Sequence, residues 1–250
     1  MFNKKSHLLI FGKGFNYSED GPGNRLIYHL KGCNLHCPWC SNPDGLKSDE
    51  YEKGTPVDEL LKEILSCKPM FFDGGGVTFT GGEILCQADA MENILFQLTE
   101  NKIHTAVETN ASLPSLKRLM PYIDYLIADF KHPNEKKLMQ VVGASLLPIK
   151  DNLKTRVLSG KPLLVRVPLI HGFNDNDEAL EGFTEFFREL SELGAKDSLW
   201  FELLKYHEYG REKWEKEGLP YTVKNGFISD KRYNEIMEFF RLRGIAAINT

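Results

Sequence analysis

The chain has 250 residues, of which 42% are apolar and 26% are charged, and its formal net charge is -4. This composition is ordinary for a globular protein with a sizeable core, and it lacks the basic excess of proteins that bind nucleic-acid backbones. No apolar run approaches the roughly 18 residues of a membrane helix, and the first segment is unlike a signal peptide, so we expect a cytoplasmic protein that binds neither nucleic acid nor membrane.

The predicted elements alternate between strand and helix from residue 25 onward. Residues 25–32 have the pattern of a strand, and a helix follows over 55–65, with Thr55 as its N-cap and Pro56 at its first helical position. The stretch "GVTFTGG", at 76–82, is rich in β-branched and aromatic residues and stops at glycines, as strands do. Later strands are predicted over 103–110, 125–131, 162–170, 199–206 and 245–249, and later helices over 88–101, 112–123, 133–143, 176–194 and 229–244.

This alternation indicates an α/β fold with a parallel sheet and helices outside it, because parallel strands need crossover connections. Six strong strand–helix units and a weak seventh strand favour a partial (β/α)6 barrel of the TIM type, with a doubly wound open sheet as the alternative. The sequence contains no repeat, linker or low-complexity segment. We therefore expect one domain over 1–250, whose last helix and strand occupy 229–250.

Reactive and polar residues follow the predicted strands at their carboxyl ends. Substrates of parallel α/β proteins bind at that end, so we expect these residues to converge on one rim. In strand order they are Cys33; Gly81, Gly82 and Glu83; Glu108, Thr109 and Asn110; Asp129 and Lys131; Arg166, which lies within its strand; and His207.

The segment "KGCNLHCPWC" places Cys33, Cys37 and Cys40 within eight residues, far from Cys67 and Cys86. This distribution indicates reduced thiols rather than a disulfide framework. Zinc sites usually draw their ligands from paired C-x-x-C or H-x(3-5)-H units, and a thioredoxin-like C-x-x-C pair has no third thiol upstream. Three thiolates on one tight loop suit three corners of a 4Fe-4S cluster, which leaves one iron for a ligand other than protein.

The spacing C-x3-C-x2-C, with Trp39 before the last cysteine, resembles the signature of the radical SAM enzymes. Four ordered segments are similar to those of the glycyl radical enzyme activating enzymes within that superfamily. They are "DGPGNRLIYHLKGCNLHCPWCSNPDG", "GGGVTFTGGEILCQ", "IADFKH" and "ELLKYHEYGREKW", and they reach from Asp20 to Trp214. The interval between Cys40 and Gly81 is too short for the ferredoxin-like insert that many relatives carry, so the resemblance implies a single cluster.

The resemblance implies that Cys33, Cys37 and Cys40 ligate a 4Fe-4S cluster whose open iron chelates S-adenosylmethionine (SAM). The SAM contacts that it implies are Trp39, Ser41, Gly81, Gly82, Glu83, Asp129, Phe130, Lys131, Arg166 and His207. The ligands that it implies for a monovalent cation are Glu108, Thr109 and Asp129. The resemblance also matches Asp20–Gly23 to a loop near the active site.

Structural roles compete with these assignments. Gly81 and Gly82 suit a tight turn, because glycine tolerates positive φ and close backbone approach. Glu83 suits the start of a helix, where the helix dipole favours a carboxylate. Asp129 and Lys131 suit a local ion pair, which contributes well under about 1 kcal/mol at a surface.

The activity implied by the resemblance is that of an oxidoreductase. An electron from flavodoxin or ferredoxin would enter the cluster, and SAM would be cleaved reductively to methionine and a 5′-deoxyadenosyl radical. That radical would take hydrogen from a glycine Cα of a partner glycyl radical enzyme. The alternatives are a radical SAM enzyme that acts on a small molecule, as the 7-carboxy-7-deazaguanine synthases do, and a non-catalytic iron-sulfur electron carrier or zinc module.

Overall fold

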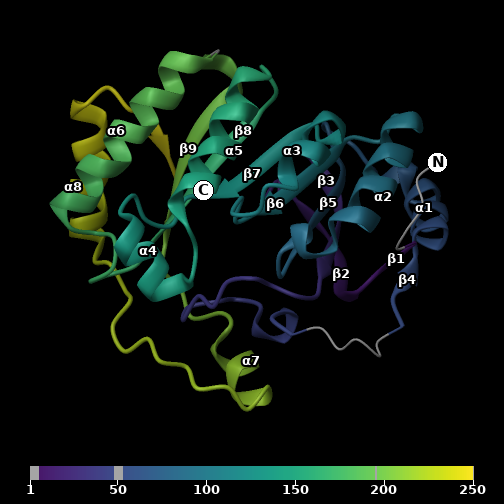
Figure 1. Ribbon diagram of the computed structural model, residues 1–250, viewed down its shortest axis with the longest axis horizontal. Coiled ribbons are helices and arrows are strands. Elements are labelled where there is room, and N and C mark those ends of the chain that lie inside the picture. The colour runs from purple at the N-terminus through teal and green to yellow at the C-terminus, as the bar shows by residue number, and fades with distance from the viewer. Residues whose placement is uncertain (1–5, 48–52, 195, 250) are drawn as a thin grey trace. The chain divides into compact units, whose positions relative to one another are not determined.

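The computed structural model describes residues 6–47, 53–194 and 196–249 (Figure 1). They form two compact units, and the chain passes between these units several times. The first unit comprises residues 1–34, 42–109 and 113–127, and the second comprises 35–41, 110–112 and 128–250. Neither unit is therefore a continuous stretch of the sequence.

The first unit contains parallel strands, as the alternating pattern predicts, and one antiparallel strand that the pattern does not predict. These strands lie side by side in the order β2 (Ile10–Tyr17), β3 (Asn24–Leu30), β5 (Gly76–Gly81) and β6 (Thr105–Thr109). Strands β3, β5 and β6 are parallel, whereas β2 runs antiparallel to β3. The register pairs Leu30 with Gly81, so the carboxyl ends of β3 and β5 are level with each other.

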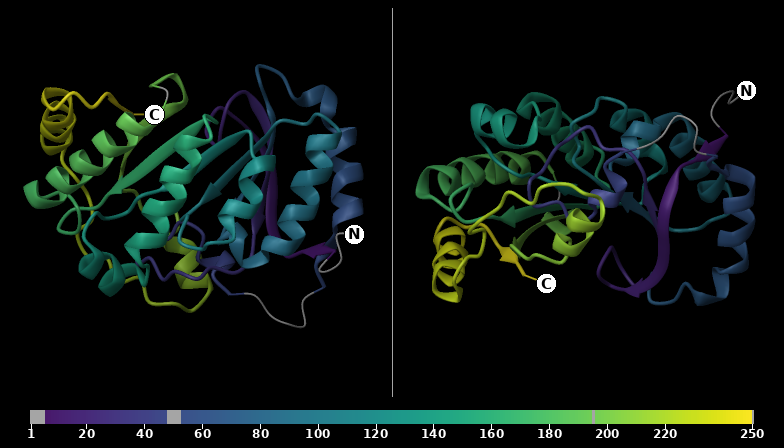
Figure 2. Two further views of the ribbon diagram at one scale, coloured as in Figure 1. Left: turned by 45° about the horizontal axis from the view of Figure 1, so that its top comes forward. Right: turned by 90° about the horizontal axis from the view of Figure 1, so that it is seen from below.

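The helices of the first unit bury apolar stripes against these strands. Helix α1 (Val57–Ser66) lies beside α2 (Ala88–Glu100), as the left view of Figure 2 shows. The fully buried residues of α2 recur at helical spacing and are Met91, Ile94, Leu95 and Leu98. Removing this stripe from water is the main stabilising contribution of the helix.

The predicted start of the first helix is wrong. Thr55 and Pro56 form the short strand β4, which pairs with β1 (His7–Leu8). Thr55 is therefore extended and is no N-cap, and α1 begins at Val57 with Pro56 as its cap residue. The cause is a pairing with residues almost 50 positions away, which helix-start patterns do not register.

The helix predicted over 112–123 is shorter than expected. Only α3 (Leu116–Leu119) is α-helical, and a 3-10 turn follows over Met120–Tyr122. Pro121 has no N–H to donate to the carbonyl four residues before it, so the α-helical hydrogen bonds do not continue through this position.

Among the described elements, the sequence pattern also fails to predict the short strand β1, strand β2, helix α5 (Leu146–Leu158) and helix α7 (Arg211–Lys216). Strand β2 contains Gly12 and Gly14, and glycine is depleted in strands. Helix α5 buries the polar side chains of Asn152 and Arg156, so it lacks a clean apolar stripe.

The second unit has the same kind of architecture. Its strands lie in the order β8 (Leu163–Leu169), β9 (Leu199–Lys205) and β10 (Ala247–Ile248), and neighbours are parallel. Its helices are α4 (Glu135–Val142), α5, α6 (Asp177–Leu193), α7 and α8 (Asp230–Leu242). Strand β7 (Tyr125–Asp129) begins in the first unit and ends in the second.

Aromatic side chains fill the core of the second unit, where α6 and α8 lie side by side (Figure 1). Phe187 of α6 stacks on Phe201 of β9, with ring centroids 4.1 Å apart, and Phe130 contacts Phe186 at 4.7 Å. Side chains alternate along a strand, so Glu202 points to the face of β9 opposite to this aromatic core.

The α/β class, with parallel strands and covering helices, is confirmed. The six main predicted strands coincide with β3, β5, β6, β7, β8 and β9 among the described residues. No described helix combines the length and the apolar character that crossing a membrane requires.

Candidate functional site

The predicted site residues are divided between the two units. The first unit contains Cys33, Gly81, Gly82, Glu83, Glu108 and Thr109. The second contains Cys37, Trp39, Cys40, Ser41, Asn110, Asp129, Phe130, Lys131, Arg166 and His207. All five cysteines are free thiols. Among the described residues, no three cysteine, histidine, aspartate or glutamate side chains are arranged as ligands of a single metal ion.

In the first unit, the end of β5 is bonded to the segment that leads into Cys33. The N–H of Gly82 donates to the carbonyl of Leu30, and the N–H of Glu83 donates to the carbonyl of Gly32, both at 2.7 Å. A Cβ added to Gly82 would lie 2.2 Å from the Gly32 oxygen. Glycine is thus required at this position for packing, whatever else it binds.

The neighbouring backbone is equally tight. Gly81 has a φ of +115°, and a Cβ there would lie 2.3 Å from the amide nitrogen of Leu30. On the other side of this segment, the N–H of Gly32 donates to the carbonyl of Gly45 at 2.8 Å, and the N–H of Cys33 donates to that of Leu46 at 3.3 Å. The backbone around the first cysteine is therefore bonded from two directions.

Glu83 joins the ends of β5 and β6. Its side chain is 1% exposed, and its Oε1 accepts hydrogen bonds from the N–H of Leu85 at 3.0 Å and from the hydroxyl of Thr109 at 2.6 Å. The adjacent Glu108 accepts from the hydroxyl of Thr80 at 2.6 Å. The structural reading of Glu83, as a carboxylate at the start of a helical turn, is confirmed.

Arg25 received no role from the sequence, yet it organises the Asp20–Gly23 loop. Its guanidinium is fully buried and donates to the hydroxyl of Thr78 at 2.7 Å and to the carbonyl of Pro22 at 3.0 Å. The Thr78 hydroxyl in turn donates to the carbonyl of Asp20 at 2.7 Å. Burial lowers the pKa of Arg25 to about 10, which still leaves it charged at neutral pH. The one sign of this role in the sequence is that Arg25 is a lone arginine in a mostly apolar strand.

In the second unit, the end of the cysteine loop forms a tight turn. The N–H of Cys40 donates to the carbonyl of Cys37 at 3.1 Å, and the N–H of His36 donates to that of Val142 at 3.1 Å. Burial raises the pKa of the Cys37 thiol to about 12, against the opposing effect of the Lys131 charge.

Asp129 and Lys131 form the ion pair that the structural reading predicts, with Nζ and Oδ2 2.5 Å apart. The residue between them, Phe130, is fully buried on the helix side, and its N–H donates to the carbonyl of Arg166 at 2.8 Å. The backbone of Lys131 is held in turn, because the amide of Asn174 donates to its carbonyl at 2.8 Å.

Arg166 pairs with a residue that the sequence did not single out. Its Nε donates to the carboxylate of Glu202, the directly opposite residue of the neighbouring strand. The Glu202 side chain is 1% exposed and that of Arg166 is 14% exposed, so the two charges neutralise each other away from most solvent. One glutamate inside the apolar run "LWFELL" was the available signal.

His207, past the end of β9, is half-buried, and burial lowers its pKa. Its ring stacks on that of Tyr209, with centroids 4.0 Å apart. Trp39 is also half-buried, and its ring lies 5.0 Å from that of Phe173. Both aromatic rings thus belong to local packing in the second unit.

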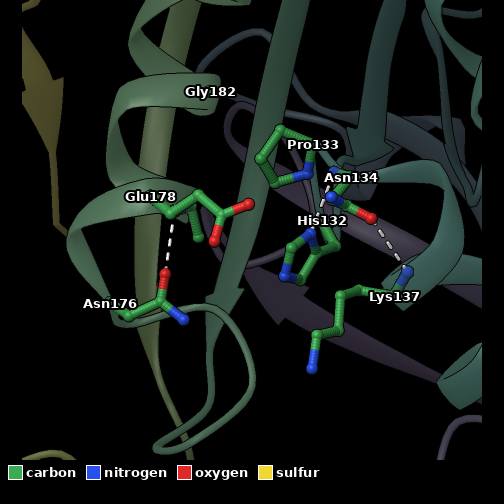
Figure 3. A pocket seen from close by; sticks show the side chains of 8 residues that line it. His132, Pro133, Asn134, Lys137, Asn176, Glu178 and Gly182 are labelled. Atoms are coloured by element: carbon green, nitrogen blue, oxygen red, sulfur yellow. Dashed lines mark hydrogen bonds between the residues drawn. The ribbon is translucent and has the colours of Figure 1, made fainter.

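The second unit also contains a cavity of about 160 Å³, which lies beside the residues that follow β7 in sequence (Figure 3). It lies between the first turns of α4 and α6, and His132, Lys137 and Glu178 line it. The His132 ring accepts a hydrogen bond from the N–H of Asn134 at 3.0 Å, and its Nε2 lies 3.1 Å from the carbonyl oxygen of Phe173. A carbonyl only accepts, so the ring is neutral with its proton on Nε2.

The fold is expected to lose stability below about pH 6.5 through His132. Burial lowers the folded-state pKa of His132; the Phe173 carbonyl opposes this shift, and Lys137 adds to it. The unfolded chain therefore binds the proton first as the pH falls. The stabilising contribution is complete above the ordinary pKa of 6.5 and is lost as the pH falls toward the lower folded-state pKa.

Melting temperatures measured between about pH 7.5 and 5.5 test this expectation. His132→Asn should reduce the fall in melting temperature over that range. The control is His7→Asn, because His7 is exposed and meets water in both states. Equal slopes in the two variants would contradict the assignment.

Comparison with known proteins shows which family and which relative this chain resembles. The family model described as the radical SAM superfamily matches residues 27–183. The chain is 34% identical over 215 residues to the pyruvate formate-lyase-activating enzyme of Staphylococcus epidermidis, a match that covers 82% of this chain and 84% of that enzyme.

Two solved structures share the fold. A domain of pyruvate-formate lyase-activating enzyme from Bacteroides vulgatus matches with a TM-score of 0.57 at 23% identity, over 71% of this chain and 99% of that chain. A radical SAM methyltransferase from Sphaerobacter thermophilus matches with a TM-score of 0.63 at 18% identity, over 90% of this chain and 66% of that chain.

Proposed function

The chain belongs to the radical SAM superfamily, and on that premise we propose that this enzyme activates a glycyl radical enzyme. The observation that carries the proposal is the 34% identity to a pyruvate formate-lyase-activating enzyme, which extends over 82% of the chain. We propose that residues 1–250 act as one radical SAM domain, since neither compact unit is continuous in sequence.

The superfamily implies a 4Fe-4S cluster and SAM, and the donor set of the chain fits the cluster. Cys33, Cys37 and Cys40 are free thiols on one loop, and a hydrogen bond joins the last two in a single turn. Cysteine ligates iron as the thiolate, so each of the three thiols would release its proton when the cluster binds. When bound, the cluster would supply the electron for reductive cleavage of SAM, which would provide the 5′-deoxyadenosyl radical that takes hydrogen from a glycine Cα.

The residues proposed to contact SAM offer it polar groups of the right kind. The N–H groups of Gly82 and Glu83 are already bonded to protein carbonyls, so we expect carbonyl oxygens of this turn to receive the SAM ammonium group, which only donates. The positive charges of Lys131 and Arg166 suit its carboxylate. The other proposed contacts are Trp39, Ser41, Gly81, Asp129, Phe130 and His207.

For Phe130, the proposed contact is limited to its carbonyl group. Its ring is buried and its N–H is bonded to Arg166. The proposed ligands of a monovalent cation are Glu108, Thr109 and Asp129, whose carboxylate and hydroxyl oxygens are hard donors.

The proposed substrate is a glycine-bearing loop of a second protein, and the proposed electron donor is a flavodoxin or ferredoxin. A cytoplasmic location belongs to the same proposal. The relative in Staphylococcus epidermidis is named for pyruvate formate-lyase, so that enzyme is the first partner to test.

The test is anaerobic incubation of the reconstituted enzyme with SAM, a reductant and pyruvate formate-lyase or another glycyl radical enzyme. We expect the doublet of a glycyl radical in the electron paramagnetic resonance spectrum of the partner. Cys37→Ala should abolish both the doublet and SAM cleavage, because a corner of the cluster loses its ligand. The control is Cys67→Ala, at the end of α1, which should retain both.

Turnover of a free metabolite without any glycyl radical would contradict the proposal and favour the small-molecule alternative. SAM cleavage that persists in Cys37→Ala would contradict the assignment of the cluster ligands.

A further inference from the structure

Both backbone polar groups of Cys40, the last cysteine of the loop, are hydrogen bonded. The N–H of Cys40 donates to the carbonyl of Cys37 at 3.1 Å, and the carbonyl of Cys40 accepts from the indole Nε1–H of Trp214 at 2.8 Å. Trp214 lies 174 residues further along the chain, on α7, which stands apart from α6 and α8 in Figure 1. A distant segment of the chain therefore contacts the cysteine loop through this hydrogen bond.

A second residue of the same segment lies against the same peptide. A Cβ added to Gly210 would be 2.6 Å from the Cys40 carbonyl oxygen and 2.7 Å from the Cα of Ser41. The N–H of Trp214 also donates to the carbonyl of Gly210 at 3.1 Å, at the first turn of α7. Glycine at this position lets the two backbones approach closely enough for the indole to reach the Cys40 carbonyl.

The indole is itself held by a small aromatic core. Trp214 is 8% exposed, and its ring meets that of Tyr221 edge-on, with centroids 5.8 Å apart. The hydroxyl of Tyr221 lies 2.5 Å from that of Tyr206, a core residue that packs with Phe173. Trp39, directly before Cys40 in sequence, packs against the same core.

We propose that Trp214 is a positioning residue for the iron-sulfur cluster, acting through the carbonyl group of Cys40. This inference rests on the proposed ligation of the cluster by Cys40. A cysteine whose N–H and carbonyl are both bonded has restrained φ and ψ, so the direction of its Cα–Cβ bond is set before iron binds. Less conformational freedom is then lost on binding, and less is regained when the cluster leaves.

The experiment measures how fast the anaerobically reconstituted enzyme loses its cluster to an iron chelator, followed by the visible absorption of the cluster. Trp214→Phe removes the N–H donor and keeps an aromatic ring. We expect it to lose the cluster roughly fivefold faster than the unmodified enzyme, the factor that corresponds to one net hydrogen bond. Before reconstitution, circular dichroism should show the same secondary structure in both proteins and a melting temperature about 2 to 4 °C lower in Trp214→Phe, because the lost hydrogen bond also costs the cluster-free fold some stability.

The matched control is Tyr221→Phe, which breaks the contact with the Tyr206 hydroxyl and keeps the ring beside Trp214. It should release the cluster at the unmodified rate. If Trp214→Phe does not fold, benzothienylalanine at position 214 replaces it, because this side chain keeps the indole shape and has sulfur in place of N–H.

The inference would be overturned if the variant without the N–H at position 214 lost its cluster at the unmodified rate. It would also be overturned if Tyr221→Phe lost its cluster as fast as Trp214→Phe, because that result would indicate general loosening of the aromatic core. An unmodified enzyme that takes up no cluster at all would overturn the proposed function together with this inference. The two failures are thus distinguishable.

Discussion

Gly82→Ala is expected to lower the free energy of unfolding by about 3 kcal/mol or more. A Cβ at this position would lie 2.2 Å from the carbonyl oxygen of Gly32 and 2.8 Å from that of Gly45. Both are backbone atoms, so the methyl group fits only if the end of β5 withdraws from the segment before Cys33. That movement breaks two backbone hydrogen bonds of 2.7 Å at the strand end.

Urea unfolding of the protein before cluster reconstitution, followed by circular dichroism, measures the loss. The matched control is Gly14→Ala in β2, where an added Cβ would meet nothing within 4 Å. That substitution should change stability by less than about 1 kcal/mol, because it only reduces the freedom of the unfolded chain. Equal stability of the two variants would show that an added methyl group at position 82 meets no steric barrier.

The iron content of Gly82→Ala after reconstitution is a second readout of the same change. We expect it to fall in parallel with stability, because the displaced segment leads directly into Cys33. Full iron content in a destabilised variant would show that the strand end supports the fold without orienting the first cysteine.

Glu202→Gln is expected to lower the free energy of unfolding by about 2 to 4 kcal/mol. Glutamine keeps the shape of the side chain and removes its charge. The guanidinium of Arg166, with 14% of its side chain exposed, would then stay charged but lose the carboxylate that faces it across the strand pair. Removing one partner of a buried pair costs far more than the pair contributes, because the desolvated charge remains.

A double-mutant cycle with Arg166→Gln separates this pairing from general damage. We expect the double variant to be more stable than the sum of the single losses implies, since neither charge is then left alone. The control is Glu238→Gln on α8, which breaks an exposed pair with Arg241 and should cost less than about 0.5 kcal/mol. Additive losses in the cycle would show that the two residues act independently.

The same variant tests the proposed role of Arg166 toward SAM. If Glu202 orients the guanidinium, Glu202→Gln should weaken SAM binding in calorimetry, whereas Glu238→Gln should not. Unchanged SAM affinity in a destabilised Glu202→Gln would restrict the pair to a structural role.

Local patterns predicted most elements but not their ends. The buried stripe of α2 and the strand "GVTFTGG" are visible because their periodicity is contained in a few residues. Thr55 and Pro56 were misassigned because their conformation depends on pairing with β1, far away in sequence. Strand β2 was missed because its two glycines hide the pattern that its pairing with β3 stabilises.

The sequence likewise predicted which residues belong to the candidate site better than it predicted their contacts. Position after a strand was enough to select Gly82, Glu83 and Asp129, since strand ends can be recognised in the sequence. The ion pair of Asp129 with Lys131 was also predictable, because the two residues are close in sequence. The hydrogen bond between Glu83 and Thr109 of the next strand was not, because the two residues are 26 positions apart and only the fold brings them together.

By itself the sequence determined the α/β class, the order of strands and helices, and the gathering of three thiols on one loop, because periodicity and spacing are properties of short stretches. Only the tertiary structure decided the partners of the buried polar groups: Glu202 for Arg166, Thr78 for Arg25, and Trp214 for the carbonyl of Cys40. The physical reason is that a buried polar group must be satisfied by whatever the fold brings beside it, and those neighbours come from distant parts of the chain.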